Sequence, residues 1–320
     1  APSRAEDREP LTYMQQRMTE GVVRDVDIVA GSRTERTSET TQLASTEAVV
    51  NTWNDQIVTS VTAYNPVNGT AALTAALAGT PGSIVVLNGS LEIVDTVTIG
   101  ENHTLLGGGA VLRVRGADTG VELHYVANGP AGRIFGDPPG LLNTYDTLIL
   151  MRSGSVMGGL DLEKTQAGGL AKSATAYVLN ADNVSIFNNT VKGSSGLRGH
   201  GIVADNSTNV RISGNTIETQ GFSNTYGIVT GAGSDLVADG NTITTNHLQS
   251  GAIFIQGGTT QFSNNTVSTK GEVVSGQDGL YRDGSSGNTI KLPYSANLQC
   301  GQFGTASGTV SFTNAPDCIF

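Results

Sequence analysis

One short phrase, Asn-Thr followed by Val or Ile, returns five times in the second half of the chain. It stands in "SIFNNTVKG", "RISGNTIET", "VADGNTITT", "QFSNNTVST" and "SSGNTIKLP", and its marker residues are Asn189, Asn215, Asn241, Asn265 and Asn288. Successive markers are 26, 26, 24 and 23 residues apart. Internal repeats of about 20 to 50 residues indicate a solenoid, a propeller or an array, because one such unit cannot bury its own apolar side chains.

Each repeat consists of short β runs without a helical period. "GIVADNSTNVRISGNTI" shows runs of three to five residues that Gly, Asn or Asp separate, which is typical of strands joined by turns. When the units are stacked, apolar residues at fixed distances from the marker form two inward columns: Ile186, Ile212 and Phe262, and Val191, Ile217, Ile243, Val267 and Ile290. The marker amides then lie about 4.8 Å apart at one turn and can hydrogen-bond along a ladder. We therefore predict a structural role for the marker asparagines.

These phrases resemble the coil repeat of the right-handed parallel β-helix, or pectin-lyase-like, superfamily. The resemblance covers roughly residues 69–292, including the upstream stretch "TAALTAALAGTPGSIVVLNGSLEIVDTVTIGENHTLLGGGAVLRV". It implies an all-β fold: a single-stranded right-handed parallel β-helix with a short N-terminal capping helix and a C-terminal cap, which shield the open ends. It does not define one function, because lyases, hydrolases, epimerases, adhesins and phage spikes share this fold.

The chain divides into three parts by composition: a charged arm or extra layer over residues 1–66, a parallel β-helix over 67–292 and a cap over 293–320. The first fifty residues carry 15 of the 46 charged residues, and "VVRDVDIVA" and "NDQIVTSVTAY" alternate as strands do. One interpretation is that the arm folds back on its own solenoid. The other is that it pairs with a neighbouring subunit and builds a filament.

Charge and composition exclude several partners. The net charge is −10, the pI is about 4.8 and only 18 residues are Lys or Arg, which argues against nucleic acid or an anionic membrane as partner. No run approaches the roughly 20 apolar residues of a membrane span. We expect self-association or an extracellular glycan as the partner.

The cysteines and the first residue favour export. The chain starts at Ala1, as a processed secretory protein does. Pairing of its only two cysteines, Cys300 and Cys318, would close a loop and stabilise the fold by about 3 kcal/mol; two unpaired thiols are the cytosolic alternative. We expect a secreted, extracellular or cell-surface protein, in which the Asn-x-Ser/Thr sites can accept glycans.

The candidate site lies where the turns before successive strands would stack. Its residues are Arg198, His200, Tyr226, Asp278 and Arg282, with Asn224 and Asp283 beside them. Stacked coils can bring an imidazole, a phenol, a guanidinium and carboxylates within about 10 to 15 Å, where they can bind a sugar or act as general acid and base. The alternative is a row of ordinary solvated turn residues. Beside it we expect an apolar and aromatic outward column, made of Val178, Val203, Val229, Phe254 and Tyr281.

Patterns of the superfamily's known enzymes are missing. Neither the aspartate set of pectate lyases nor the Asp-Pro-His pattern of mannuronan epimerases occurs in the sequence. "RGHG" matches the Gly-His-Gly of polygalacturonases, but their Asp-Asp and Arg-Ile-Lys motifs are absent. His103 and His247 stand alone, as turn or surface residues, and nothing predicts a metal or a cofactor.

Two functions remain open. The first is a non-enzymatic structural, adhesive or assembly-forming β-helix protein, favoured by the regular solenoid, the apolar outward column and the charged arm. The alternative is an extracellular carbohydrate-active enzyme, a polysaccharide lyase, glycoside hydrolase or transferase, that acts in a groove on the β-helix face.

Overall fold

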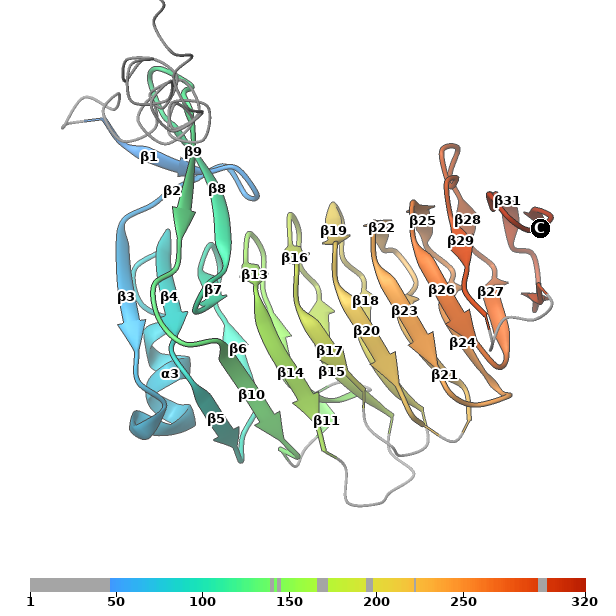
Figure 1. Cartoon of the computed structure of the whole chain (residues 1–320), viewed down its shortest axis with the longest axis horizontal. Coiled ribbons are helices and arrows are strands. Elements are labelled where there is room, and N and C mark those ends of the chain that lie inside the picture. Colours follow the sequence, from blue (N-terminus) through green and yellow to red (C-terminus); the bar gives the residue numbers. More distant parts are fainter. Residues whose placement is uncertain are drawn as a thin grey trace, which may run out of the picture.

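The structure is a computed structural model that describes residues 47–138, 141–142, 145–165, 172–193, 198–221, 223–292 and 298–320. Its strands stack in parallel as a solenoid, and the coils follow one another along the long axis from the blue to the red end of Figure 1. The all-β parallel fold expected from the repeats is thus confirmed. Among the helices of the described residues, none is long and apolar enough to cross a membrane.

Three sheets form the solenoid within the described part of the chain. The eleven-stranded sheet contains β3 (Ser60–Tyr64), β4 (Ser83–Leu87), β7 (Thr104–Gly107), β13 (Val156–Gly158), β16 (Ser185–Phe187), β19 (Val210–Ser213), β22 (Asp235–Asp239), β25 (Thr259–Ser263), β28 (Leu280–Tyr281), β31 (Ser307–Val310) and β32 (Cys318–Ile319). The eight-stranded sheet contains β5 (Ser90–Ile93), β10 (Gly132–Gly136), β14 (Leu160–Lys164), β17 (Thr190–Lys192), β20 (Thr216–Thr219), β23 (Thr242–Thr245), β26 (Thr266–Thr269) and β29 (Thr289–Ile290). The nine-stranded sheet contains β6 (Val97–Ile99), β11 (Leu141–Leu142), β12 (Tyr145–Met151), β15 (Ser173–Leu179), β18 (Gly199–Asp205), β21 (Thr225–Thr230), β24 (Ser250–Gln256), β27 (Glu272–Gln277) and β30 (Cys300–Gln302).

One coil contributes one strand to each sheet, so that equivalent residues of successive coils lie side by side. Ile186 pairs with Ile212, whose column continues through Ala238 to Phe262. The second predicted column, Val191, Ile217, Ile243, Val267 and Ile290, is paired throughout. All of these side chains are buried, so both inward columns are confirmed.

The marker asparagines form an unbroken ladder at the corner between the eleven- and eight-stranded sheets. Oδ1 of Asn215, Asn241, Asn265 and Asn288 each accepts the backbone N–H of the preceding marker, at 2.9 to 3.0 Å. The Nδ2 group of Asn215 donates to the carbonyl of Ile186 in the coil before it, at 2.9 Å. The markers are at most 2% exposed. The ladder therefore satisfies backbone groups that the tight corner buries away from water.

The stacking starts before residue 67, because β3 pairs in parallel with β4. A short helical segment follows, made of η1 (Pro66–Asn68) and α3 (Gly69–Ala76). Leu73 and Leu77 are fully buried in the main core, and α3 lies at the N-terminal end of the solenoid in Figure 1. The short Ala/Leu segment is helical because its apolar residues recur at helical spacing and reach that core.

A small antiparallel sheet stands above the N-terminal coils in Figure 1. It consists of β1 (Val49–Asn51), β2 (Gln56–Ile57), β8 (Val111–Gly116) and β9 (Glu122–Val126), in the order β2-β1-β8-β9. Between β1 and β2, the Trp53 ring stacks on Phe187 with centroids 4.6 Å apart and planes within 2°. This part of the arm therefore covers its own solenoid. "VVRDVDIVA" and the rest of residues 1–46 lie outside the described residues, so filament formation by the arm stays a prediction.

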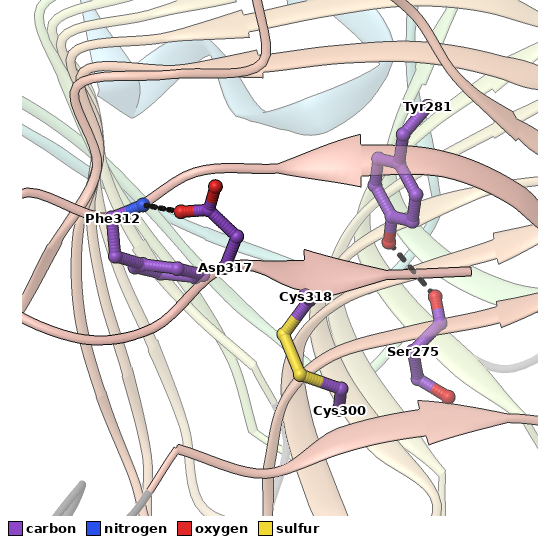
Figure 2. The surroundings of a disulfide bond; sticks show 6 residues. All are labelled: Ser275, Tyr281, Cys300, Phe312, Asp317 and Cys318. Atoms are coloured by element: carbon purple, nitrogen blue, oxygen red, sulfur yellow. Dashed lines mark hydrogen bonds between the residues drawn. A yellow bond between two sulfur atoms is a disulfide. The ribbon is translucent and has the colours of Figure 1, made fainter.

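The C-terminal strands continue the stacking beyond residue 292. Val274 pairs with Cys300, and Tyr281 pairs with Gly308. Cys300 and Cys318 form a disulfide with their Cα atoms 5.7 Å apart, which Figure 2 shows beside Tyr281. The Tyr281 hydroxyl donates to the carbonyl of Ser275 at 2.8 Å.

Candidate functional site

The outward column of the nine-stranded sheet differs from the prediction at both ends. Its members are Leu150, Tyr177, Val203, Val229 and Phe254. Val178, which the sequence analysis placed here, faces the main core, because neighbouring residues of a strand point to opposite faces.

Tyr281 was also predicted in this outward column and does not belong to it. It lies in β28 of the eleven-stranded sheet and is buried in the main core. The coil that contains Asn288 has no Gly-Ile-Val phrase to mark its strand in the nine-stranded sheet, and Val273 and Val274 of β27 take that place instead.

Aromatic rings from successive coils contact one another along the outer face of this sheet. The aromatic row consists of Tyr145, Tyr177, His200, Tyr226 and Phe254. Tyr145 meets Tyr177 and His200 edge-on, with centroids 5.1 and 5.7 Å apart. His200 is stacked with Tyr226 at 5.9 Å, and Tyr226 with Phe254 at 4.8 Å. Such contacts hold the rings in fixed positions.

A pocket of about 310 Å³ opens beside the aromatic row. It is lined by Tyr145, Lys172, Arg198, His200, Asn224, Tyr226, Val229, Phe254, Gln256 and Phe303. Two of these side chains are cations and none is a carboxylate. The described lining therefore combines aromatic surface with positive charge, although the whole chain is acidic.

The cations lie at the corner where the chain enters the nine-stranded sheet. Lys172, Arg198 and Asn224 each stand directly before a strand and are 26 residues apart. Arg198 has φ 57°, and Asn224 has φ 49°. Asparagine tolerates this left-handed conformation, whereas for arginine it costs about 1 to 2 kcal/mol. The coil thus holds the guanidinium at the pocket in spite of a local backbone cost.

His200 is a buried, neutral member of the site. Its side chain is enclosed, and its Nδ1 accepts the backbone N–H of Tyr226 at 3.1 Å. Burial, with a smaller contribution from the positive charges of Lys172 and Arg198, lowers the pKa of His200 to about 3. The interpretation of His200 and Tyr226 as solvated turn residues is therefore wrong, because both are buried.

The phenols of the site remain protonated at neutral pH. Burial raises the pKa of Tyr145 to about 12, with a contribution from nearby Tyr177 and Asp205. Burial, together with the nearby Glu272 carboxylate, also raises the pKa of Tyr226 to about 12. Both hydroxyl groups can therefore donate hydrogen bonds to a ligand, and neither is a ready proton acceptor.

Asp278 and Arg282 do not join this cluster. Asp278 Oδ1 accepts from the N–H and hydroxyl of Thr305, at 3.1 and 2.9 Å, beside a different pocket of about 510 Å³. Arg282 forms an ion pair with Asp235, at 2.9 Å between Nη2 and Oδ1. The column of His200 and Tyr226 continues instead through Gly251 to Glu272. The error follows from aligning the coil that contains Asn288 one strand too late.

Three residues of the site were not predicted from the sequence: Tyr145, Lys172 and Tyr177. The repeat could have identified two of them, because subtracting 26 from Arg198 gives Lys172 and subtracting 26 from Val203 gives Tyr177. His103 follows a turn, as expected, but its side chain is buried, and its Nδ1 lies 2.8 Å from the carbonyl oxygen of Glu101. Within the described residues, no group of three or more His, Cys, Asp or Glu side chains could hold a metal ion.

Comparison with known proteins agrees with the fold. Residues 174–316 match the family described as right handed beta helix region. The parallel stacking of the strands in three sheets agrees with this match over the second half of the chain. No curated protein matches the sequence.

Solved structures that resemble this chain include enzymes, viral proteins and an adhesin. The rice weevil pectin methyl esterase has 12% identity and a TM-score of 0.42, with 93% of this chain and 97% of that chain covered. Geobacillus virus E2 ORF18 has 11% identity and a TM-score of 0.37, with 78% of this chain covered, and the chain spans 62% of that protein. PfbA, a surface adhesin of Streptococcus pneumoniae, has 10% identity and a TM-score of 0.29, with 76% and 83% covered.

Proposed function

We propose that the protein is an extracellular adhesive β-helix protein that binds an anionic glycan chain on the outer face of the nine-stranded sheet and does not cleave it. The aromatic row carries this proposal. Four of its rings, those of Tyr145, His200, Tyr226 and Phe254, line one pocket, and apolar faces of sugar rings pack well on aromatic side chains. A solenoid suits a polymeric ligand because its stacked coils form one continuous elongated face.

The charges of the pocket support an acidic sugar as ligand. Lys172 and Arg198 lie at its edge, and the described lining contains no carboxylate. A guanidinium can hold a carboxylate through two parallel hydrogen bonds. Tyr145 and Tyr226 add neutral donors for sugar hydroxyl groups. The net charge of the chain is negative, so the rest of its surface repels an anionic ligand and favours binding at this pocket.

The protonation states support binding without cleavage. A general acid or base works best with a pKa near the working pH, whereas the pKa of His200 is about 3 and those of both phenols are about 12. Hydrolysis by a carboxylate pair also needs two acids that flank the bond. The described lining of the pocket offers no such pair.

A carbohydrate-active enzyme is the second candidate, and two pairs of a phenol and a carboxylate favour it. Glu272 is near enough to Tyr226 to raise the pKa of its phenol, and Asp205 accepts a hydrogen bond from the Tyr177 hydroxyl at 3.2 Å. A ligand that changed these contacts could turn a phenol and a carboxylate into a proton-transfer pair. A lyase or transferase fits this arrangement better than a two-carboxylate hydrolase.

The disulfide supports the extracellular location, because such bonds persist in oxidising compartments. We also assign α3 and the disulfide-linked residues 298–320 as the two end caps. α3 buries Leu73 at one end, and the other end carries the Cys300–Cys318 bond. Covering both ends leaves the sheet face as the surface for a ligand.

Binding is tested with uronate-containing and neutral polysaccharides by isothermal calorimetry. We expect binding to the uronate polymers alone, a lower affinity at high salt, and about a tenfold loss in Phe254→Ala or Lys172→Gln. Leu248→Ala is the matched control, because Leu248 is 75% exposed and is not part of the pocket lining. Equal binding of the neutral polymers would contradict the assigned ligand.

Catalysis is tested on the same polymers by following unsaturated products and new reducing ends. We expect binding without turnover. Turnover that disappears in Tyr226→Phe, which keeps the ring and removes only the hydroxyl, would establish the enzyme and refute the adhesive function.

A further inference from the structure

A lysine is buried completely at the corner between the eight- and nine-stranded sheets. Lys164 is the last residue of β14, and its side chain has no exposed surface. Its Nζ lies 3.0 Å from Oδ1 of Asp137 and 3.3 Å from Oδ2 of Asp146. Lysine is almost never fully buried unless it is paired. Here one amine is held between two carboxyl groups and away from water.

Lys192 provides a contrast in the same sheet. Its Nζ also lies near two carboxylates, those of Asp161 and Glu163, each at 3.9 Å. Its side chain is 40% exposed, however. Ion pairs of this kind remain solvated and are worth little. The enclosed geometry of Lys164 is thus not a general feature of lysines on this sheet.

The two carboxyl groups around Lys164 differ in their surroundings. The Asp146 side chain is 12% exposed and that of Asp137 is 34% exposed. Oδ1 of Asp146 is buried and has no hydrogen-bond partner. Burial raises the pKa of Asp146, although Lys164 opposes this shift. Burial therefore favours the acid form of Asp146, whose Oδ2 lies in direct contact with Nζ of Lys164.

We propose that Lys164 and Asp146 condense to an intramolecular isopeptide bond. Asp137 takes a proton from the Lys164 ammonium, and the free amine attacks Cγ of Asp146 in its acid form. The bond between Nζ and Cγ forms, and the bond between Cγ and the acid hydroxyl breaks. One proton of the amine leaves with that hydroxyl as water. The ammonium, the acid and the Asp137 carboxylate thus give an amide, one water and protonated Asp137.

The geometry favours this step over a permanent ion cluster. Two reacting groups that are held in contact avoid the entropic cost of meeting, which is a large part of the barrier. Burying an ammonium between carboxylates also costs desolvation free energy, and the amide removes that charge. The bond would join the end of β14 to β12 at the corner. It is independent of the glycan pocket.

The intact mass of the purified 320-residue chain tests the proposal directly. Under denaturing conditions we expect the sequence mass, corrected for the disulfide, less the mass of one water. Trypsin should then give one branched product, in which residues 134–152 are joined to residues 153–172 without cleavage after Lys164. Fragmentation of this product should place the link at Asp146. A chain with no mass loss, or a link at Asp137, overturns the proposal.

Three variants separate the isopeptide bond from other losses of water. Lys164→Gln should abolish the mass loss completely, whereas a succinimide at Asp146 would survive in this variant and would refute the bond. Asp146→Asn should still form the link but lose ammonia in place of water. Lys192→Gln is the matched control and should keep the full loss of water. The mass of the wild-type chain decides whether the isopeptide bond exists, so the test does not depend on whether a variant folds.

Discussion

Replacing His200 by Phe should remove a specific part of the pH dependence of stability. The pKa of His200 is about 3 in the folded chain and that of an unfolded histidine is about 6.5. As the pH falls below 6.5, His200 becomes protonated in the unfolded chain but stays neutral in the folded chain. Stability is therefore fully present above pH 6.5 and decreases as the pH falls toward 3.

The size of the effect follows from the pKa difference. One pKa unit corresponds to about 1.4 kcal/mol, so the upper bound is on the order of 5 kcal/mol, and about 2 kcal/mol is lost between pH 7.5 and 5. Carboxylates also titrate in this range. We therefore compare how much unfolding free energy the wild-type chain and His200→Phe each lose between the two pH values. The wild-type chain should lose about 2 kcal/mol more than His200→Phe over this interval.

Urea unfolding at pH 7.5 and 5, followed by circular dichroism, measures both free energies of unfolding. Phe lacks the Nδ1 acceptor for the Tyr226 N–H and lowers stability at both pH values, but the pH difference does not depend on that loss. His124 is exposed, and His124→Gln should keep the wild-type behaviour. If wild type and His200→Phe lost the same free energy between the two pH values, the buried neutral imidazole would be refuted, and general acid catalysis by His200 would become open again.

Three further results are expected. Asn215→Ala should cost about 3 kcal/mol in urea unfolding, because it leaves a buried N–H and a carbonyl of the ladder unpaired, while the exposed neighbour Thr216→Ala should change stability by less than about 0.5 kcal/mol. Cys300→Ser should lower the free energy of unfolding by about 3 kcal/mol, and a reductant should then have no further effect, in contrast to wild type. Trp53→Ala should cost about 2 kcal/mol and increase hydrogen exchange in β1 and β2 only, because Trp53 stacks on Phe187; a global increase in exchange would contradict a local layer.

The regular part of the fold could be predicted because every coil repeats the same physical solution. Ile217 and Ile243 face the core at the same distance from a marker Asn, and each marker satisfies the backbone of the coil before it. These positions are fixed by alternation along a strand and by the spacing of the coils. The same pattern of core-facing residues and marker Asn therefore recurs several times in one sequence.

The last coil and the N-terminal layer could not be predicted in this way. Tyr281 lies in another sheet because the spacing shortens toward the C-terminus. The hairpin of β8 and β9 leaves the solenoid and pairs with β1, a contact between segments that no repeat relates. Trp53 and Phe187, which are 134 residues apart and which no repeat relates, also contact each other. Such contacts depend on the shape of the folded chain.

The candidate site lies where the repeat is broken on its outer face. Gly251 occupies the column position between Tyr226 and Glu272, and a Cβ added there would lie 2.9 Å from the Tyr226 ring. The missing side chain gives this ring the room to lie flat against Phe254. Arg198 stands at a left-handed corner position that suits the Asn224 of the next coil better. Both departures weaken the regularity of the solenoid, yet together they place an aromatic surface and a cation at one pocket. In a fold whose core is set by repetition, the irregular outward residues are therefore the ones that define what the surface can bind.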